Sequence, residues 1–307
     1  MKIAVFGAGG IGGYFGGRLA QGGADVHLIA RGEHLHSLQS SGLRVESIHG
    51  DFQVDLPATD DPATIGPCDY VLFCVKSFDT VTAAEKLPPL LDQETGVISL
   101  QNGVGNEETL QKHVGAEHVL GGVAYIFSTI AEPGMIEHTG GPARIVFGEF
   151  ERENGPRAKR FSEFGDRATM ELELSSEIKS DIWEKLAFIC AQAGMTAAVR
   201  LPIGSIRDVE DSWEMFRSMV EEVCAVADAA GIDLPESTVP SKLDFARELP
   251  YDSYSSLHYD LTNGKRMELE ALCGEVVRRG KEENVPVPYC DAVYRILKPW
   301  KLENDAD

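Results

Sequence analysis

The sequence predicts an α/β protein in two parts, a doubly wound parallel sheet followed by an all-α region. A short apolar segment, Lys2–Phe6, leads directly into a glycine-rich turn. Strand-like and helix-like segments then alternate to about residue 175, as expected when helices cover both faces of a parallel sheet. After Ser176 only helical patterns follow, separated by proline and glycine. We therefore expect a Rossmann-type domain at 1–175 and an all-α domain at 176–307.

The glycine-rich turn has the pattern G-x-G-x-x-G between a strand and a predicted helix at 14–20. Its first glycine makes the tight turn, the second admits a pyrophosphate close to the backbone, and the third lets the helix pack on the strand. The helix N-terminus adds free N–H groups for the phosphates. The alternative is a structural glycine turn without a ligand. The context favours a dinucleotide site formed by Gly7, Ala8, Gly9, Gly10, Ile11 and Gly12.

Further strands are expected along the first half of the chain. Segment 25–30 is predicted as a second short strand. Segments 69–75 and 96–100 are almost continuously apolar, as in strands buried on both faces. A hairpin is predicted around His49-Gly50, pairing 43–48 with 52–56. Three more strands are predicted at 119–127, 134–138 and 144–147.

The second half begins with a helical pattern that runs to about Val199, with Ser176 or a neighbour as its N-cap. More helices are predicted at 209–230, 236–248, 253–262, 266–283 and 288–298. Residues 301–307 are polar and are expected to form a frayed tail.

The composition narrows the function classes. The chain has 307 residues and a formal net charge of -21, so nucleic acid and anionic membranes would repel it. The six cysteines include no C-x-x-C pair, which predicts a reducing, cytoplasmic location and no metal site. The first predicted strand begins at residue 2, and no apolar run approaches membrane length, so no signal peptide and no membrane span are expected.

The end of the second strand indicates which nucleotide binds. In this fold an acidic residue there contacts the ribose 2′-OH of NAD, whereas an arginine accommodates the 2′-phosphate of NADP. Here the strand is followed by Arg31, while Asp25 lies too early and Glu33 lies beyond the arginine. The alternative for Arg31 is an ordinary surface side chain beside a turn. The sequence favours NADP(H).

Two polar residues follow buried strands at the ligand-binding edge of the predicted sheet. Lys76 follows the strand that ends at Val75, and Asn102 opens an Asn-Gly turn. Each alone can be a turn residue, but their equivalent positions favour contact with a ligand. Periodicity alone would make Lys185 and Glu268 solvated helix residues.

At this point the sequence resembles the ketopantoate (2-dehydropantoate) reductases, nearly from end to end. The glycine turn and Arg31 match this family. So do five further blocks: Val75-Lys76, Gln101–Gly105, Trp183–Leu186, Ser255–Leu257, and Glu268–Glu270 with Gly274. The last three, in this order and spacing after a Rossmann-type half, are far more specific than the glycine turn. The resemblance implies a second domain like the helical domains of 6-phosphogluconate dehydrogenase-like enzymes. It also implies reduction of a 2-oxo acid or related ketone by NADPH, as in the conversion of 2-dehydropantoate to pantoate in pantothenate biosynthesis.

The resemblance assigns roles to particular residues. Lys185 matches the general acid, and Glu268 matches the acid on the hydroxyl side of the substrate. Ser256 matches a substrate-binding hydroxyl. Asn102 and Lys76 match residues at the junction of nicotinamide and substrate, and Arg31 matches the 2′-phosphate contact.

The chain departs from the family in the substrate pocket. Family members that reduce ketopantoate carry asparagines where this sequence has Ile189, Ala193 and Ile203. Each lost amide partner would cost a polar ligand about 1–3 kcal/mol. Gln192 and Thr196 fall within about 20° of Lys185 around the helix. They are therefore candidates for substitute hydrogen bonds, or they pack at the domain seam.

Two other functions are compatible with this plan. An opine-type or hydroxyacid dehydrogenase would usually carry a catalytic histidine, for which His138 and His258 are the nearest candidates. A non-catalytic NADP(H)-sensing module would explain the lost asparagines but would not need the proton donor. The expected partner is a small-molecule 2-oxo acid. The physiological substrate, the hydride stereochemistry and the oligomeric state, with a homodimer as one option, stay open.

Overall fold

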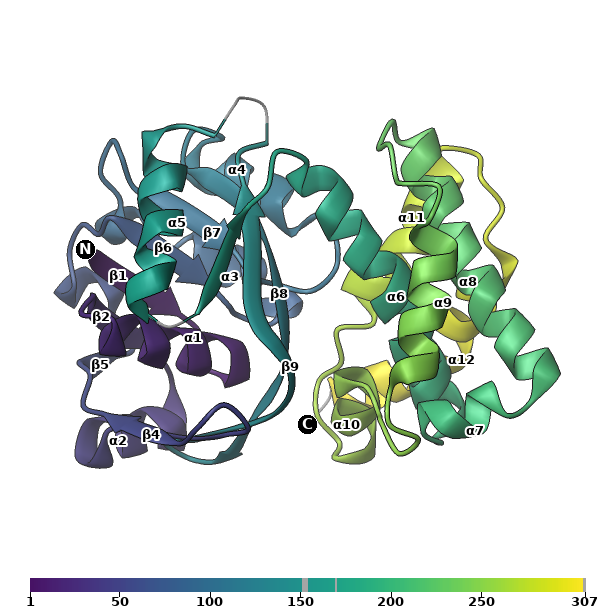
Figure 1. Ribbon diagram of the computed structural model, residues 1–307, viewed down its shortest axis with the longest axis horizontal. Coiled ribbons are helices and arrows are strands. Elements are labelled where there is room, and N and C mark those ends of the chain that lie inside the picture. The colour runs from purple at the N-terminus through teal and green to yellow at the C-terminus, as the bar shows by residue number, and fades with distance from the viewer. Residues whose placement is uncertain (151–153, 169, 306–307) are drawn as a thin grey trace. The chain divides into compact units, whose positions relative to one another are not determined.

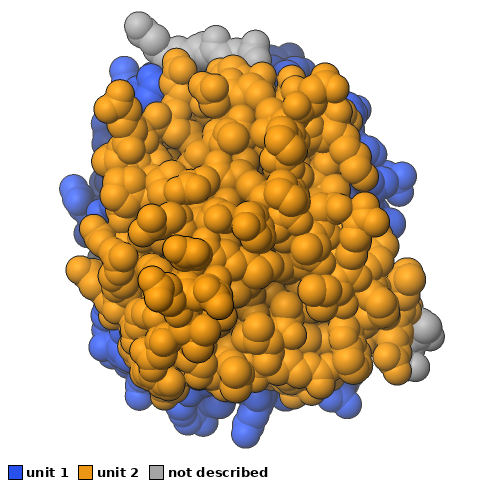
Figure 2. All heavy atoms as spheres, turned by 90° about the vertical axis from the view of Figure 1, so that its right-hand side faces the viewer, with its two compact units in different colours: residues 1–101, 106–178 blue, residues 102–105, 179–307 orange. Residues whose placement is uncertain are grey.

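We analysed a computed structural model of the chain, which describes residues 1–150, 154–168 and 170–305. The structure divides into two compact units, coloured in Figure 2. Unit 1 comprises residues 1–101 and 106–178, and unit 2 comprises residues 102–105 and 179–307. The short loop 102–105 therefore belongs to unit 2, although it follows a strand of unit 1.

Unit 1 contains a parallel sheet with the strand order β5-β2-β1-β6-β7-β8 (Figure 1). This is the order of a doubly wound dinucleotide-binding sheet, so the predicted fold class is confirmed. Its strands are β1 (Lys2–Phe6), β2 (Asp25–Ile29), β5 (Ala58–Thr59), β6 (Tyr70–Phe73), β7 (Gly96–Ser99) and β8 (Val119–Glu132).

Alternating side chains of the strands supply two cores, one on each face of this sheet. Ile3 and Val5 of β1 join one cluster with residues of α1 (Gly10–Gln21) and α5 (Pro156–Ala168). Ala4 and Phe6 join the other, with residues of α3 (Thr80–Ala84) and α4 (Asn106–Val114). Figure 1 shows α1 and α5 along the first face. Burial on both faces explains why these strands are almost continuously apolar.

The sheet is extended by β9 (Met135–Gly148), which pairs antiparallel with β8. The predicted hairpin is confirmed as β3 (Leu43–Ser47) and β4 (Phe52–Val54), with β3 parallel to β9. The prediction of two strands at 134–138 and 144–147 is wrong, since β9 is continuous. The pairing of β8 and β9 instead shifts register near Tyr125 and Phe127, and this irregularity accommodates the glycines of the segment.

For several elements of unit 1 the sequence predicted alternating strands and helices but no range. They are the helices α2 (Gly32–Ser41), α3, α4 and α5, the strands β5 and β10 (Glu171–Leu174), of which β10 pairs with β9, and the 3₁₀ turns η1 (Pro62–Thr64), η2 (Ser77–Asp79) and η3 (Pro88–Leu90). The first helix also begins at Gly10 rather than at Tyr14, because the glycines of the turn form its first residues.

All regular elements described within residues 179–305 are helical, as predicted. Its elements are α6 (Ile178–Val199), α7 (Ile203–Arg207), α8 (Glu210–Ala229), α9 (Thr238–Glu248), α10 (Ser256–Thr262), the π-helical turn η4 (Glu270–Gly274), α11 (Glu275–Glu282) and α12 (Pro288–Asn304). The short helix α7 was not predicted. None of the helices in the described ranges is both long and apolar enough to span a membrane.

Two predicted boundaries in this half are wrong, and a third is made more definite. Of Ser176 and its neighbours, it is Ser175 whose hydroxyl accepts the N–H of Glu177 before α6. The helix expected at 266–283 begins only at Glu270, and its first turn is π-helical because the Gly274 N–H bonds the carbonyl of Leu269, five residues back. The expected frayed tail is helical as far as Asn304.

Candidate active site

The glycine turn of unit 1 has the shape that a diphosphate requires. Gly7 has φ +98°, and a Cβ there would lie 2.9 Å from the carbonyl carbon of Cys74. A Cβ on Gly12 would lie 2.2 Å from the carbonyl oxygen of Gly7. A Cβ on Gly9, in contrast, would meet no atom within 4 Å. Gly7 and Gly12 therefore serve internal packing, whereas Gly9 borders open space at the start of α1, where a phosphate can approach the backbone.

Arg31 lies at the same edge of the sheet as this turn. The Gly7 N–H donates to the carbonyl of Ile29, the last residue of β2, and Arg31 follows two residues later. Its side chain is 76% exposed, and its Nη2 lies 2.5 Å from Oδ2 of Asp79. An exposed guanidinium held by one carboxylate retains donors for a phosphate group.

The buried side chain of Gln101 links the carboxyl ends of β6 and β7. The sequence indicated Gln101 only as part of the motif at 101–105. The amide of Gln101 donates to the carbonyl of Val75 at 3.0 Å and to Oγ1 of Thr80 at 2.8 Å. Lys76, exposed, comes directly after Val75 and precedes η2. A glutamine shortly after a buried strand is the sequence signal for such a link, because its buried amide needs hydrogen-bond partners.

The loop 102–105 brings Asn102 to the lysine of α6 within unit 2. Lys185 Nζ donates to Oδ1 of Asn102 at 2.7 Å. Gly103, with φ +92°, allows this approach, because a Cβ there would lie 2.1 Å from the carbonyl oxygen of Ala271 in η4. The loop is therefore packed against the π-helical turn that follows Glu268.

Lys185 has the electrostatic environment of a proton donor. Its burial lowers the pKa of the ammonium to about 8, and the negative charge of Glu268 acts in the opposite direction and raises it. Glu268 is itself buried, with 7% of its surface exposed. A lysine with a pKa near neutrality can hold a proton at pH 7 and release it to a strong base.

A second polar group of unit 2 joins α6 to α10. Thr196 is fully buried, and its Oγ1 lies 2.7 Å from the carbonyl of Gln192 and 2.8 Å from Oγ of Ser255. Ser255 also accepts the N–H of His258, which caps α10. Since the carbonyl oxygen of Gln192 can only accept, the Thr196 hydroxyl donates to it and accepts a hydrogen bond from the Ser255 hydroxyl. These contacts favour a positioning role for Thr196.

Two other residues of the predicted substrate site have different environments. Nε2 of Gln192 is buried and has no hydrogen-bond partner within the described part of the chain. Ser256 is exposed at the first residue of α10.

The two histidines considered for a different dehydrogenase chemistry have structural roles. His138 is buried; its Nε2 donates to the carbonyl of Gly140 and its Nδ1 accepts from Ser47 Oγ, both at 2.9 Å. Burial lowers the pKa of the His138 imidazole. His258 stacks on Tyr254, with ring centroids 4.1 Å apart. Neither has the environment of a catalytic base.

Comparison with known proteins identifies the family. Residues 3–152 match the family model described as ketopantoate reductase PanE/ApbA, and residues 177–301 match the model of its C-terminal part. The chain belongs to the ketopantoate reductase family. It is therefore an oxidoreductase that acts on CH–OH groups and uses a nicotinamide cofactor, and its family reduces 2-oxo acids to hydroxy acids.

Individual relatives match this chain over nearly their whole length. A 2-dehydropantoate 2-reductase of Halobacterium salinarum is 32% identical over 290 residues, which cover 94% of this chain and 95% of the relative. An uncharacterized oxidoreductase of Bacillus subtilis, YkpB, is 31% identical over 305 residues, 99% of this chain and all of the relative. The crystal structure of a PanE/ApbA family ketopantoate reductase from Ralstonia eutropha superposes with a TM-score of 0.91 at 34% identity, covering 99% of this chain and 100% of that one.

Proposed function

We propose that the protein reduces a 2-oxo acid to the 2-hydroxy acid with NADPH, using residues 1–175 to bind the cofactor and 176–307 to bind substrate and supply the proton. The observation that carries this proposal is the Lys185 ammonium, hydrogen-bonded to Asn102 at 2.7 Å and held near neutral pKa beside Glu268. The Asn102 side chain accepts a hydrogen bond from this ammonium, and the negative charge of Glu268 favours its charged form.

The cofactor preference rests on the sheet edge. The turn Gly7–Gly12 offers backbone N–H groups and an open approach at Gly9 for the pyrophosphate. Arg31 presents its exposed guanidinium for the 2′-phosphate, while Lys76 and Asn102 follow the neighbouring strands. When bound, NADPH supplies a hydride to the carbonyl carbon of the substrate.

The chain's own residues deal with the charge that this transfer creates. Addition of a hydride to a ketone leaves negative charge on its oxygen. The Lys185 ammonium stabilises this oxygen and donates a proton from Nζ to it, so that the carbonyl becomes a hydroxyl and the lysine becomes neutral. Glu268 accepts a hydrogen bond on the hydroxyl side of the substrate, and Ser256 provides a second polar contact.

The substrate class follows from what replaces the family's asparagines. Ile189, Ala193 and Ile203 are apolar, and the last two are buried. The amide of Gln192 has an unsatisfied buried nitrogen one residue before Ala193, which suits a hydrogen bond to an oxygen of the substrate. We therefore propose a 2-oxo acid with a less polar acyl group than ketopantoate.

A steady-state NADPH oxidation assay across a panel of 2-oxo acids tests this function. The panel contains ketopantoate, straight-chain and branched apolar 2-oxo acids, and phenylpyruvate. We expect the highest kcat/KM with an apolar member, and Gln192→Leu should lower it about tenfold, as expected for one hydrogen bond to a charged or polar ligand. Efficient turnover of ketopantoate alone would contradict the altered substrate class. Tight NADPH binding without turnover of any member would favour a cofactor-sensing module.

A further inference from the structure

His34 in α2 is connected to the glycine turn by a hydrogen bond that the proposed reaction does not use. Its Nε2 lies 2.7 Å from the carbonyl oxygen of Ala8, in the middle of the turn. On the other side of the ring, the N–H of Gly134 donates to Nδ1 at 3.0 Å. The imidazole therefore bridges the glycine turn and the turn between β8 and β9.

These two contacts define the tautomer of His34. Because an N–H of the backbone donates to Nδ1, this nitrogen carries the lone pair, so Nε2 carries the hydrogen and donates to Ala8. Burial lowers the pKa of the His34 imidazole, which keeps it in this neutral form. Both ring nitrogens are thus used to full capacity.

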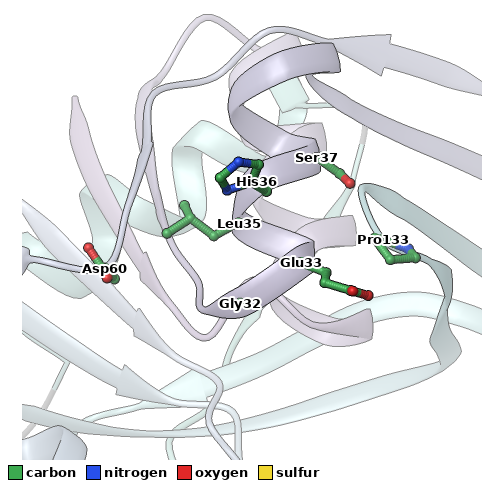
Figure 3. A pocket seen from close by; sticks show the side chains of 7 residues that line it. All are labelled: Gly32, Glu33, Leu35, His36, Ser37, Asp60 and Pro133. Carbon is green, nitrogen blue, oxygen red and sulfur yellow. The ribbon is translucent and has the colours of Figure 1, made fainter.

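The turn at Gly134 is shaped to reach the histidine. Gly134 has φ +82° after Pro133, the arrangement of a type II turn. A Cβ at Gly134 would lie 2.9 Å from Cβ of Ser37. Figure 3 shows Glu33 and Ser37 of α2 on the side of Pro133, around a hollow of about 700 Å³. None of the glycine-turn residues 7–12 lines this hollow.

Peptide geometry carries the effect of His34 from Ala8 to Gly9. The Ala8 carbonyl and the Gly9 N–H belong to one planar trans peptide, in which they point in opposite directions. The N–H groups of Gly7 and Ala8 both donate to the carbonyl of Ile29, at 3.0 and 3.1 Å. With the peptide before it held by β2 and its own carbonyl held by His34, the Gly9 N–H is turned away from α2. Gly9 is also the residue that borders open space.

We propose that His34 is a positioning residue for the dinucleotide, which aims the Gly9 N–H at the pyrophosphate by holding the carbonyl of Ala8. This inference rests on the nicotinamide site but not on the identity of the 2-oxo acid. Removing the Nε2–H of His34 should weaken binding of every ligand that contains the pyrophosphate. It should leave binding of the adenosine 2′-phosphate end unchanged.

The test is a set of equilibrium titrations of the full-length protein with NADPH, NADH and adenosine 2′-monophosphate. His34→Ala should raise Kd for both dinucleotides by the same factor, about tenfold for one hydrogen bond, and leave adenosine 2′-monophosphate unaffected. His34→Gln, which can place an amide N–H near the position of Nε2, should recover most of the affinity, whereas the shorter His34→Asn should not. His36→Ala is the matched control, since His36 is exposed on the same helix, and it should bind like wild type.

Several results would overturn this role. The role is refuted if His34→Ala binds both dinucleotides as tightly as wild type. It is also refuted if His34→Ala loses affinity for adenosine 2′-monophosphate by the same factor, because that result indicates general damage to unit 1. If His34→Ala does not fold, His34→Gln and His34→Asn are compared at equal thermal stability. Equal dinucleotide affinities of these two variants would then refute the role of His34. Wild-type preference for NADH would contradict only the proposed cofactor choice, and failure to turn over any 2-oxo acid would contradict only the proposed reaction.

Discussion

Reduction by this protein should lose activity as the pH rises through 8. If Lys185 donates the proton, only its ammonium form is active. With a pKa of about 8, the lysine is about 91% protonated at pH 7 and about 9% protonated at pH 9. The rate constant kcat/KM for reduction should therefore fall about tenfold between these two pH values. The reverse oxidation requires the neutral amine and should rise over the same range.

The assay is NADPH oxidation at subsaturating 2-oxo acid, measured in one mixed buffer at constant ionic strength. A 2-oxo acid is fully ionised throughout this range, so its own titration does not contribute. Glu268→Gln removes the negative charge that raises the pKa of Lys185, and it should move the midpoint of the profile to lower pH. Glu270→Gln is the matched control, because Glu270 is exposed and contacts Lys298 and Tyr294 instead.

Lys185→Ala should lower kcat by about 10²–10⁴-fold and remove the step near pH 8. A flat wild-type profile from pH 7 to 9 would refute the assigned donor. The same holds for a step that persists in Lys185→Ala, or for a midpoint near the 10.5 of an unperturbed lysine.

Three further predictions concern the cofactor, the loop and the α6–α10 contact. Arg31→Ala should weaken NADPH binding about 10–100-fold while leaving NADH binding unchanged in the same titration; equal losses would contradict the 2′-phosphate contact. Gly103→Ala should lower the free energy of unfolding by about 1–3 kcal/mol, seen as a lower Tm in calorimetry, since φ is +92° and a Cβ would overlap the carbonyl of Ala271. Thr196→Val should raise KM more than it lowers kcat, because α10 loses its hydrogen bond to α6; an unchanged KM would limit Thr196 to packing.

Local patterns predicted the elements that position the cofactor. The apolar segments at 2–6, 70–73 and 96–99 need burial on both faces, and this requirement can be recognised in the letters of each segment alone. The glycine turn is similarly local, because the positive φ of Gly7 and the contact of Gly12 with Gly7 arise within six residues. The continuous β9 was missed because its glycines signal a turn, whereas pairing with β8 across a register shift keeps the strand intact.

The helical half shows the limit of periodicity. A repeat near 3.6 residues predicted one helix at 266–283, but it does not distinguish an α-helical from a π-helical turn. The turn ends at Gly274, where a Cβ would lie 2.8 Å from a carboxylate oxygen of Glu270 and 3.0 Å from the ring of Tyr294, so the position requires a small residue. The late start of this helix leaves Glu268 in the preceding loop, outside any regular element.

The sequence by itself determined the fold class, the glycine turn and the candidate site residues such as Lys185 and Glu268. The first two depend on backbone sterics and on side-chain types a few residues apart, and the site residues were found by the resemblance of short blocks. Only the tertiary structure decided the environment of the Lys185 side chain. Its periodicity is that of a solvated lysine, yet Oδ1 of Asn102, 83 positions away, accepts a hydrogen bond from its ammonium group, and burial lowers its pKa to about 8. Desolvation and hydrogen bonding depend on which distant segments meet, and no local pattern carries that information.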